Sequence, residues 1–171
     1  MNRIFPTSLS DTIRTIILLI LLSLVVSFTL CYQIINVRGT SMLPTLVNGD
    51  VCLAQKICLK LNRGDLIGFN IKIQGRDRSL VKRIIGLPGE TITILPLSIV
   101  ICGLTERVFV IEENYLDPKI KNPECLTVTL EKDEYFVLGD NRQISAGSVQ
   151  FGPVGRSHIK YKFILTLFRS F

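Results

Sequence analysis

An uncharged apolar stretch near the N-terminus constrains the fold of this chain more than any other feature. From Thr15 to Val37 no residue carries a charge, and aliphatic side chains dominate. A helix needs about 20 such residues to cross the hydrocarbon core of a bilayer. We therefore predict a transmembrane helix over residues 15–37, a short cytoplasmic tail over residues 1–14, and one folded domain over residues 38–171.

A cleaved secretory signal peptide is the alternative to an anchor. The apolar part of such a peptide is about 7 to 15 residues long and ends at small residues of an Ala-x-Ala type. The stretch here is longer and no such site follows it, so we expect it to remain as an anchor. Arg3 and Arg14 outnumber Asp11 before the stretch, which favours a cytoplasmic N-terminus by the positive-inside rule, although Arg38 lies directly after it.

The net charge of +6 does not indicate a nucleic-acid-binding protein. The basic residues are scattered, whereas nucleic-acid binders gather them into a stripe with interleaved aromatic residues. Basic residues near a membrane are attracted to anionic lipid headgroups, and a solvated mixed surface explains the charge equally well. We expect a lipid bilayer as one partner and no nucleic acid.

Five cysteines indicate neither a metal site nor a particular disulfide. They lack the paired CxxC spacing of a zinc site, and His158 is the single histidine. In an oxidising space Cys52 could pair with Cys58, or Cys102 with Cys125, and the sequence does not choose between these pairings. We expect free buried thiols, no metal and no cofactor.

Beyond residue 37, short runs of β-branched and aromatic residues alternate with Gly, Pro, Asn and Asp. This spacing is typical of an all-β domain, and no helical periodicity or internal repeat interrupts it. Turns are predicted at Asn48-Gly49-Asp50 and Asn62-Arg63-Gly64-Asp65, where glycine adopts a positive φ, and residues 114–126 should form the longest irregular loop. We predict antiparallel sheets with strands at residues 50–54, 66–69, 80–85, 91–94, 108–111, 127–130, 135–138 and 163–168.

Ser41 and Lys82 can act as a nucleophile and its base. A serine hydroxyl is a weak nucleophile at neutral pH and must pass its proton to a base as it attacks. Because His158 lies in no recognisable triad context, a lysine is the remaining choice. Lysine is a base only when neutral, which burial favours, and in a strand Lys82 would share a face with Leu80 and Ile84. Taken singly, such residues are more often a turn serine and an edge-strand charge.

Three segments resemble the type I signal peptidases, the leader peptidases of serine protease family S26 that use a Ser/Lys dyad. These segments are Gly-Thr-Ser-Met-Leu-Pro-Thr-Leu around Ser41, Val-Lys-Arg-Ile-Ile-Gly-Leu-Pro-Gly-Glu around Lys82, and Gly-Asp-Asn-Arg-Gln-Ile-Ser ending at Ser145. The resemblance runs from the anchor to the C-terminus. Few residues separate Ser41 from Lys82, which implies the compact form of the family and its signal-peptidase-like β fold.

The resemblance also implies a role for each residue. Ser41 would be the acylated nucleophile, Lys82 the general base, and Ser145 the hydroxyl that orients the lysine amine. The backbone N–H of Ser41 would hold the oxyanion. Gly39 stands where some members carry a serine that assists, and Thr40 is a further candidate donor.

One departure from the family pattern follows Ser145. The family usually continues Ala-Asp-Ser-Arg, whereas this chain reads Ala146-Gly147-Ser148-Val149, so both partners of a bracing ion pair are absent. The loss of a whole pair leaves no charge unpaired. We expect packing to hold this loop, with Asp140 and Arg142 of the preceding turn retained.

The predicted function is that of a membrane-anchored serine endopeptidase that cleaves N-terminal signal peptides from exported preproteins. It would act as a monomer, with its catalytic domain (residues 38–171) on the extracytoplasmic side of a plasma (inner) membrane; thylakoid and mitochondrial inner membranes are alternatives. The family's preference for small residues at the first and third positions before the cut implies shallow pockets. The C-terminal segment, residues 163–171, would either rest on the bilayer or form the last core strand.

Other functions remain open at this point. A conjugation-type maturation peptidase is also membrane-attached and would differ mainly in its substrate. A self-cleaving repressor-type protease shares the Ser/Lys chemistry but is soluble. A non-catalytic, membrane-anchored peptide-binding β domain, or a pseudoenzyme, predicts that Lys82→Ala changes nothing.

Overall fold

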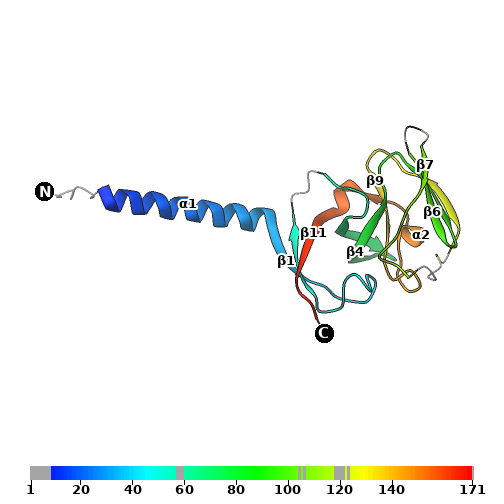
Figure 1. The fold of residues 1–171 in the computed structure, drawn as a ribbon, viewed down its shortest axis with the longest axis horizontal. Helices are drawn as coiled ribbons and strands as arrows, with labels where there is room; N and C mark the ends of the chain where they lie inside the picture. Colours follow the sequence, from blue (N-terminus) through cyan, green and yellow to red (C-terminus); the bar gives the residue numbers. More distant parts are fainter. Residues whose placement is uncertain are drawn as a thin grey trace.

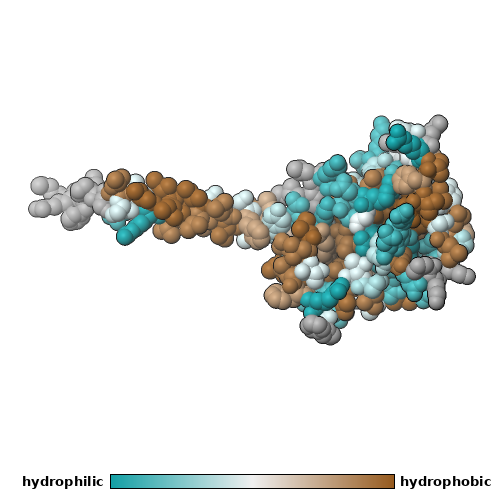
Figure 2. Space-filling model, in the orientation of Figure 1, coloured by the Kyte–Doolittle hydropathy of each residue, from teal (hydrophilic) through white to brown (hydrophobic). Residues whose placement is uncertain are grey.

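A long helix projects from a β domain in the computed structural model, which describes residues 9–56, 60–103, 105, 107–117, 122 and 124–170 (Figure 1). Helix α1 (Leu9–Cys31) has no buried residue. Its length and apolar composition suffice to cross a membrane, and its surface is predominantly hydrophobic (Figure 2). Within the described residues the helix runs from Leu9 to Cys31, whereas the sequence predicted a span from Thr15 to Val37.

The chain passes from α1 into strand β1 (Tyr32–Asn36) without a connecting loop. Two hydrogen bonds from Lys56 cover the last turn of the helix: its backbone N–H donates to the Cys31 carbonyl and its ammonium donates to the Thr29 carbonyl, each at 2.8 Å. The predicted helix end is wrong because residues 32–36 pair with a strand, so their backbone bonds lie within a sheet.

Two antiparallel sheets make up the domain, as the strand spacing predicted. The larger sheet has the order β1-β2-β11-β3-β4-β9-β10 and the smaller one β7-β6-β5-β8. All eight predicted strands are present; β1, β6 and β10 were not predicted. The further elements of the larger sheet are β2 (Val51–Gln55), β3 (Leu66–Ile73), β4 (Arg76–Gly86), β9 (Glu134–Leu138), β10 (Val154–Gly155) and β11 (Ile159–Phe168). The smaller sheet contains β5 (Thr91–Leu95), β6 (Ser98–Cys102), β7 (Val108–Val110) and β8 (Leu126–Thr129), and the two short helical turns are α2 (Ser148–Phe151) and η1 (Arg156–His158).

Strands β4 and β9 supply side chains to two separate cores because successive residues of a strand point to opposite faces. Ile84 and Val137 belong to the cluster inside the larger sheet, whereas Ile85 and Phe136 belong to the cluster beneath the smaller sheet. A third cluster, which we call the Met42 cluster, contains the buried residues Val37, Met42, Leu46, Cys52 and Phe163. These three clusters fix β4 from both sides.

Glycine supplies the predicted positive φ in both turns, at Gly49 (96°) and Gly64 (87°). Among the described cysteines all thiols are free, with Cys52 buried and Cys125 exposed, so the expectation of burial holds for Cys52 and not for Cys125. Cys58 lies outside the described residues.

Candidate active site

Ser41 lies in an irregular turn that is fixed from below by its neighbour Met42. The Met42 side chain is 2% exposed and packs in the Met42 cluster, which leaves half-buried Ser41 at the surface of the sheet. Gly39 has a φ of 93°, a conformation that favours glycine. Its N–H donates to the side-chain carbonyl of Asn48 at 2.9 Å.

Asp50 ties this turn to the last residues of the described chain. Its fully buried carboxylate accepts hydrogen bonds from the backbone N–H groups of Val47 at 2.9 Å and Ser170 at 2.8 Å. Burial alone would raise the pKa of Asp50, but these bonds and the nearby Arg169 hold it below its usual value. The Arg169 guanidinium also donates to the Thr45 carbonyl. The turn that carries Ser41, residues 39–46, is therefore tied to Asn48 at its start and to Arg169 and Asp50 near its end.

Lys82 is a buried lysine in the middle of β4. It lies opposite Ile67 of β3 and is 2% exposed, with the aliphatic neighbours Leu80 and Ile84 on its face, as predicted. Burial lowers the pKa of Lys82 from its ordinary value to about 8, and the negative charge of Asp140 opposes this shift. At pH 7 about one such amine in ten is neutral, compared with about one in 3,000 at an ordinary lysine.

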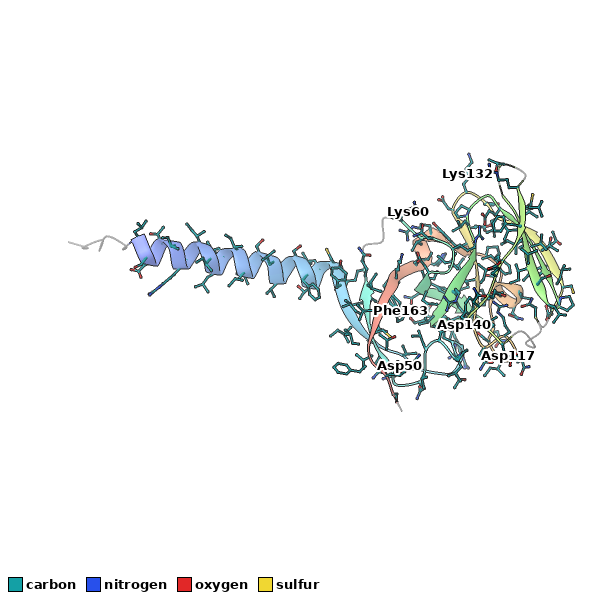
Figure 3. All side chains as sticks on the ribbon, in the orientation of Figure 1. Asp50, Lys60, Asp117, Lys132, Asp140 and Phe163 are labelled. Atoms are coloured by element: carbon teal, nitrogen blue, oxygen red, sulfur yellow. The ribbon has the colours of Figure 1, made fainter. Side chains whose placement is uncertain are left out.

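Asp140, the carboxylate whose negative charge acts on Lys82, is already bound by other groups. Asp140, fully buried next to β4 (Figure 3), accepts two hydrogen bonds from the Arg83 guanidinium at 2.9 and 2.5 Å and one from the Thr45 hydroxyl at 2.5 Å. The Arg83 guanidinium also lies 4.0 Å from the ring of Tyr115. None of the ion pairs among the described residues involves Lys82, so its amine is buried without a paired counterion.

Ser41, Lys82 and Ser145 converge on Gly139. Arg83 pairs with Leu138 in the β4–β9 register; continuing it by one residue places Gly139 opposite Lys82, so both residues face the same side. A Cβ at Gly139 would lie 1.9 Å from Ser145 Oγ and 2.6 Å from the Ser41 carbonyl oxygen. Only glycine leaves room for both serines beside the lysine.

Hydrogen bonds join the turn that carries Ser145 directly to the turn that carries Ser41. The backbone N–H of Asn141 donates to the Ser41 carbonyl at 3.1 Å, and its side-chain amide donates to the Thr40 carbonyl at 3.1 Å. The Asn141 carbonyl in turn accepts from the Ser145 N–H at 3.0 Å. Asn141 therefore holds the two serines in a fixed relation.

Hydrogen bonds and an ion pair hold the loop around Ser145, where the sequence led us to expect packing. Buried Arg142 donates to the Gly139 carbonyl at 3.1 Å and pairs with the Glu113 carboxylate. The hydroxyl of buried Ser148 accepts the Val137 N–H at 2.9 Å. At Gly147 a Cβ would lie 2.9 Å from the Val137 carbonyl, so an aspartate would be crowded there.

Tyr115 and Asn122, from residues 114–126 to which the sequence assigned no chemistry, contribute to this network together with Glu113; residues 118–121 and 123 of that predicted loop lie outside the described residues. Tyr115 donates a hydrogen bond to Glu113 at 2.5 Å, and the side-chain carbonyl of Asn122 accepts from Arg142 at 2.8 Å. Burial is the largest cause of a raised pKa at Tyr115, followed by its bond to Glu113. Sequence reasoning missed these residues because Arg142 and Arg83, which they contact, lie far away in the chain. It also missed Gly139, although this glycine opens the segment that ends at Ser145.

A pocket of about 210 Å³ lies beside Ser41. Its walls are formed by the end of β1, the turn that carries Ser41 and the segment Ser79–Val81 of β4, and Tyr161 of β11 also lines it. In the strand pairing, β9 ends at Leu138 opposite Arg83, so Leu80 and Val81 pair with β3 alone and leave one backbone edge open. This arrangement can accept an extended peptide next to the serine.

No group of His, Cys, Asp and Glu residues within the described part of the chain is arranged to hold a metal ion. The described titratable groups at the site are instead Lys82, Arg83, Asp140 and Arg142. A serine, a buried lysine and backbone donors can carry out acyl transfer without a metal.

Comparison with known proteins identifies similar chains. The family model described as "Signal peptidase, peptidase S26" matches residues 9–168. A signal peptidase I of Leptolyngbya laminosa is 35% identical over 163 residues, which cover 88% of this chain and 75% of the relative. A signal peptidase I of Bacillus licheniformis is 33% identical, over 82% of this chain and 78% of the relative.

Proposed function

The chain belongs to the signal peptidase family, peptidase S26, and cleaves signal peptides as a serine endopeptidase; we propose that Ser41 is its nucleophile, Lys82 its general base and Ser145 the hydroxyl that orients the lysine. The observation that carries this assignment is that Lys82 is buried without a paired counterion on β4, where the strand register places it opposite Gly139, the glycine at which the Ser41 and Ser145 turns meet. Burying an unpaired amine lowers the stability of the fold, and a lysine with a purely structural role would offer no compensating gain.

The geometry supports a two-step reaction. The neutral Lys82 amine accepts the Ser41 hydroxyl proton as Oγ attacks the substrate carbonyl carbon, and the backbone N–H of Ser41 donates to the oxyanion. Collapse of the tetrahedral intermediate breaks the peptide C–N bond, and the Lys82 ammonium gives its proton to the leaving amine. Lys82 then deprotonates a water molecule that hydrolyses the acyl ester and restores Ser41.

The open edge of β4 supports binding of the preprotein as an added strand. Main-chain hydrogen bonds from Leu80 and Val81 would give affinity, and the pocket beside Ser41 would receive side chains from one face. Successive residues of an extended peptide alternate between faces, so the first and third residues before the cut enter the same pocket. Its modest volume, about 210 Å³, supports a preference for small side chains at both positions.

We further propose that α1 is the single membrane anchor, that residues 38–171 form the catalytic domain on the extracytoplasmic side of a plasma (inner) membrane, and that the enzyme acts as a monomer. Exposed apolar side chains on β1, which continues α1, and on β11 support contact with the bilayer: Ile34 is 68% exposed, Leu165 48% and Phe168 72%. Hydrophobic surface continues from α1 onto this part of the domain (Figure 2). Phe163, by contrast, is buried, so the C-terminal strand is part core and part apolar surface.

A tryptophan reporter tests this bilayer contact, because the chain contains no tryptophan. Phe168→Trp should be quenched by lipids with brominated acyl chains when the protein is reconstituted in vesicles. Phe109→Trp, on β7 at the far end of the domain (Figure 1), serves as the matched control and should remain unquenched. Equal quenching at the two positions would contradict contact through β11.

Cleavage of a preprotein with an Ala-x-Ala site by the detergent-solubilised protein tests the dyad. Ser41→Ala and Lys82→Ala should each lower kcat by about 10⁴-fold or more, while Lys72→Ala, an exposed lysine on β3, should leave it unchanged. Full activity of the Lys82 variant would exclude the dyad. Activity of the wild type only on a specialised precursor would instead indicate a conjugation-type maturation peptidase.

A further inference from the structure

Tyr161 lies across strand β3 in a gap that a glycine leaves open. In the register of the larger sheet Tyr161 pairs with Gly68, and Gly68 pairs with Val81 of β4. A Cβ at Gly68 would lie 2.0 Å from Tyr161 Cε2 and 2.6 Å from its hydroxyl oxygen. The phenol ring therefore covers the Gly68 backbone and extends from β11 toward β4.

Contacts on two sides fix the ring in this position. Phe163 packs against it edge to face, with ring centroids 5.5 Å apart and an angle of 68°. The hydroxyl of Tyr161 interacts with Ser79 of β4, which lowers its pKa, but burial has the larger effect and raises the pKa of the phenol, so the group stays protonated. A half-buried ring held at both ends is a wall and not a mobile side chain.

The ring lines one particular end of the pocket beside Ser41. Val81 directly precedes Lys82. Ser79 lies two residues before Val81, on the same face of β4 as Val81. Two residues of a strand advance by about 6.6 Å, the same distance that separates alternate residues of an extended peptide. If the first residue before the cut lies at Val81, the third lies at Ser79 and Tyr161.

We propose that Tyr161 determines which side chain is accepted at the third residue before the scissile bond, because its ring closes that end of the pocket. The inference rests on the proposed function, since it assumes that the substrate binds along the open edge of β4. Gly68 has a supporting role: its missing side chain allows the ring to reach the pocket. Substrates with small residues at that position are the class that this wall admits.

A series of peptides that differ only at the third position before the cut, with Ala, Val, Leu or Phe there, tests the proposal on the full chain in detergent. The wild type should cleave the Ala peptide best. Tyr161→Ala should raise the ratio of kcat/KM for Leu over Ala by about tenfold or more, because one excess methylene in a closed pocket already costs about 10- to 200-fold. Tyr161→Phe should keep the wild-type ratio, and so should Lys160→Ala, a substitution of the exposed neighbour on β11.

A second series, varied at the first position before the cut, separates a specific wall from general loosening. The first-position preference of Tyr161→Ala should equal that of the wild type; widening at both positions, or an unchanged third-position ratio, would overturn the proposal. If thermal unfolding shows that the Ala variant does not fold, Tyr161→Leu retains apolar contact with Phe163 and is expected to give the same change. If the wild type cleaves none of the peptides, the proposed function itself is overturned, and the inference with it.

Discussion

Gly139→Ala adds a single methyl group at the point where the two serines meet. The new Cβ would lie 1.9 Å from Ser145 Oγ, 2.4 Å from Ser145 Cβ and 2.6 Å from the Ser41 carbonyl oxygen. The Ser145 hydroxyl can rotate away, but its Cβ and the Ser41 carbonyl belong to less flexible parts of the two turns. The methyl group must therefore displace at least one turn.

The size of that displacement sets the expected loss of activity. Ordinary contact begins at 3.4 Å, so the Ser41 carbonyl has to move by about 0.8 Å and Ser145 Cβ by about 1 Å. A misplacement of about 1 Å in a catalytic group can cost about 10²-fold in rate. We expect kcat to fall about 100-fold, whereas KM should change less because Gly139 does not line the pocket beside Ser41.

A fluorogenic peptide with an Ala-x-Ala site, followed under single-turnover and steady-state conditions, separates the two constants. Gly103→Ala is the matched control, because the nearest atom to its added Cβ is the Arg107 carbonyl oxygen at 3.7 Å; it should behave as the wild type. Overpacking at Gly139 should also lower the free energy of unfolding by about 1 to 3 kcal/mol. A kcat within threefold of the wild type would refute the convergence of the serines on this glycine.

Three further outcomes are expected. The logarithm of kcat/KM should rise with a slope of one and level off near pH 8, because the pKa of Lys82 is lowered to about 8 and only the neutral amine is a base; a plateau already at pH 6 would contradict this assignment. Since that pKa lies below its unfolded value, Lys82→Met should raise the free energy of unfolding at pH 7 by about 2 to 4 kcal/mol, and wild-type stability should approach the variant's as the pH rises from 8 through 10. Ser148→Ala should lower the unfolding free energy by about 1 to 3 kcal/mol, measured by thermal denaturation, because the buried Val137 N–H loses its acceptor; an unchanged melting temperature would show that another group replaces the hydroxyl.

The sequence predicted strands where β-branched residues alternate between two faces, and the structure contains all of them. It failed at β1, because Tyr32–Asn36 continues the apolar character of the preceding helix and nothing local distinguishes lipid from a neighbouring strand. Strand β6, Ser98–Cys102, was missed as well: Pro96 and Leu97 precede it, and its pairing with β5 and β7 identifies it.

In the candidate site, too, the sequence predicted the residues that local motifs mark and missed those that depend on distant contacts. Ser41, Lys82 and Ser145 could be named from motifs, and the alternation of a strand was sufficient to place Lys82 among aliphatic side chains. The partners of Arg142 could not be named, because Glu113 reaches it from a segment 29 residues earlier in the chain. Contacts of that kind depend on how the two sheets meet, which local sequence does not encode.

The direct passage from α1 into β1 limits the distance between Ser41 and the end of α1. With no loop between Cys31 and Tyr32, and with Lys56 bonded to the last turn of the helix, the backbone limits how far Ser41 can lie from the end of α1. Ten residues at about 3.3 Å each limit the distance from Cys31 to Ser41 to about 33 Å. With α1 as the proposed anchor and Ser41 as the proposed nucleophile, we expect the enzyme's backbone to set the distance from the bilayer at which a preprotein is cut, so a precursor whose scissile bond lies at another distance should be a poor substrate whatever its side chains.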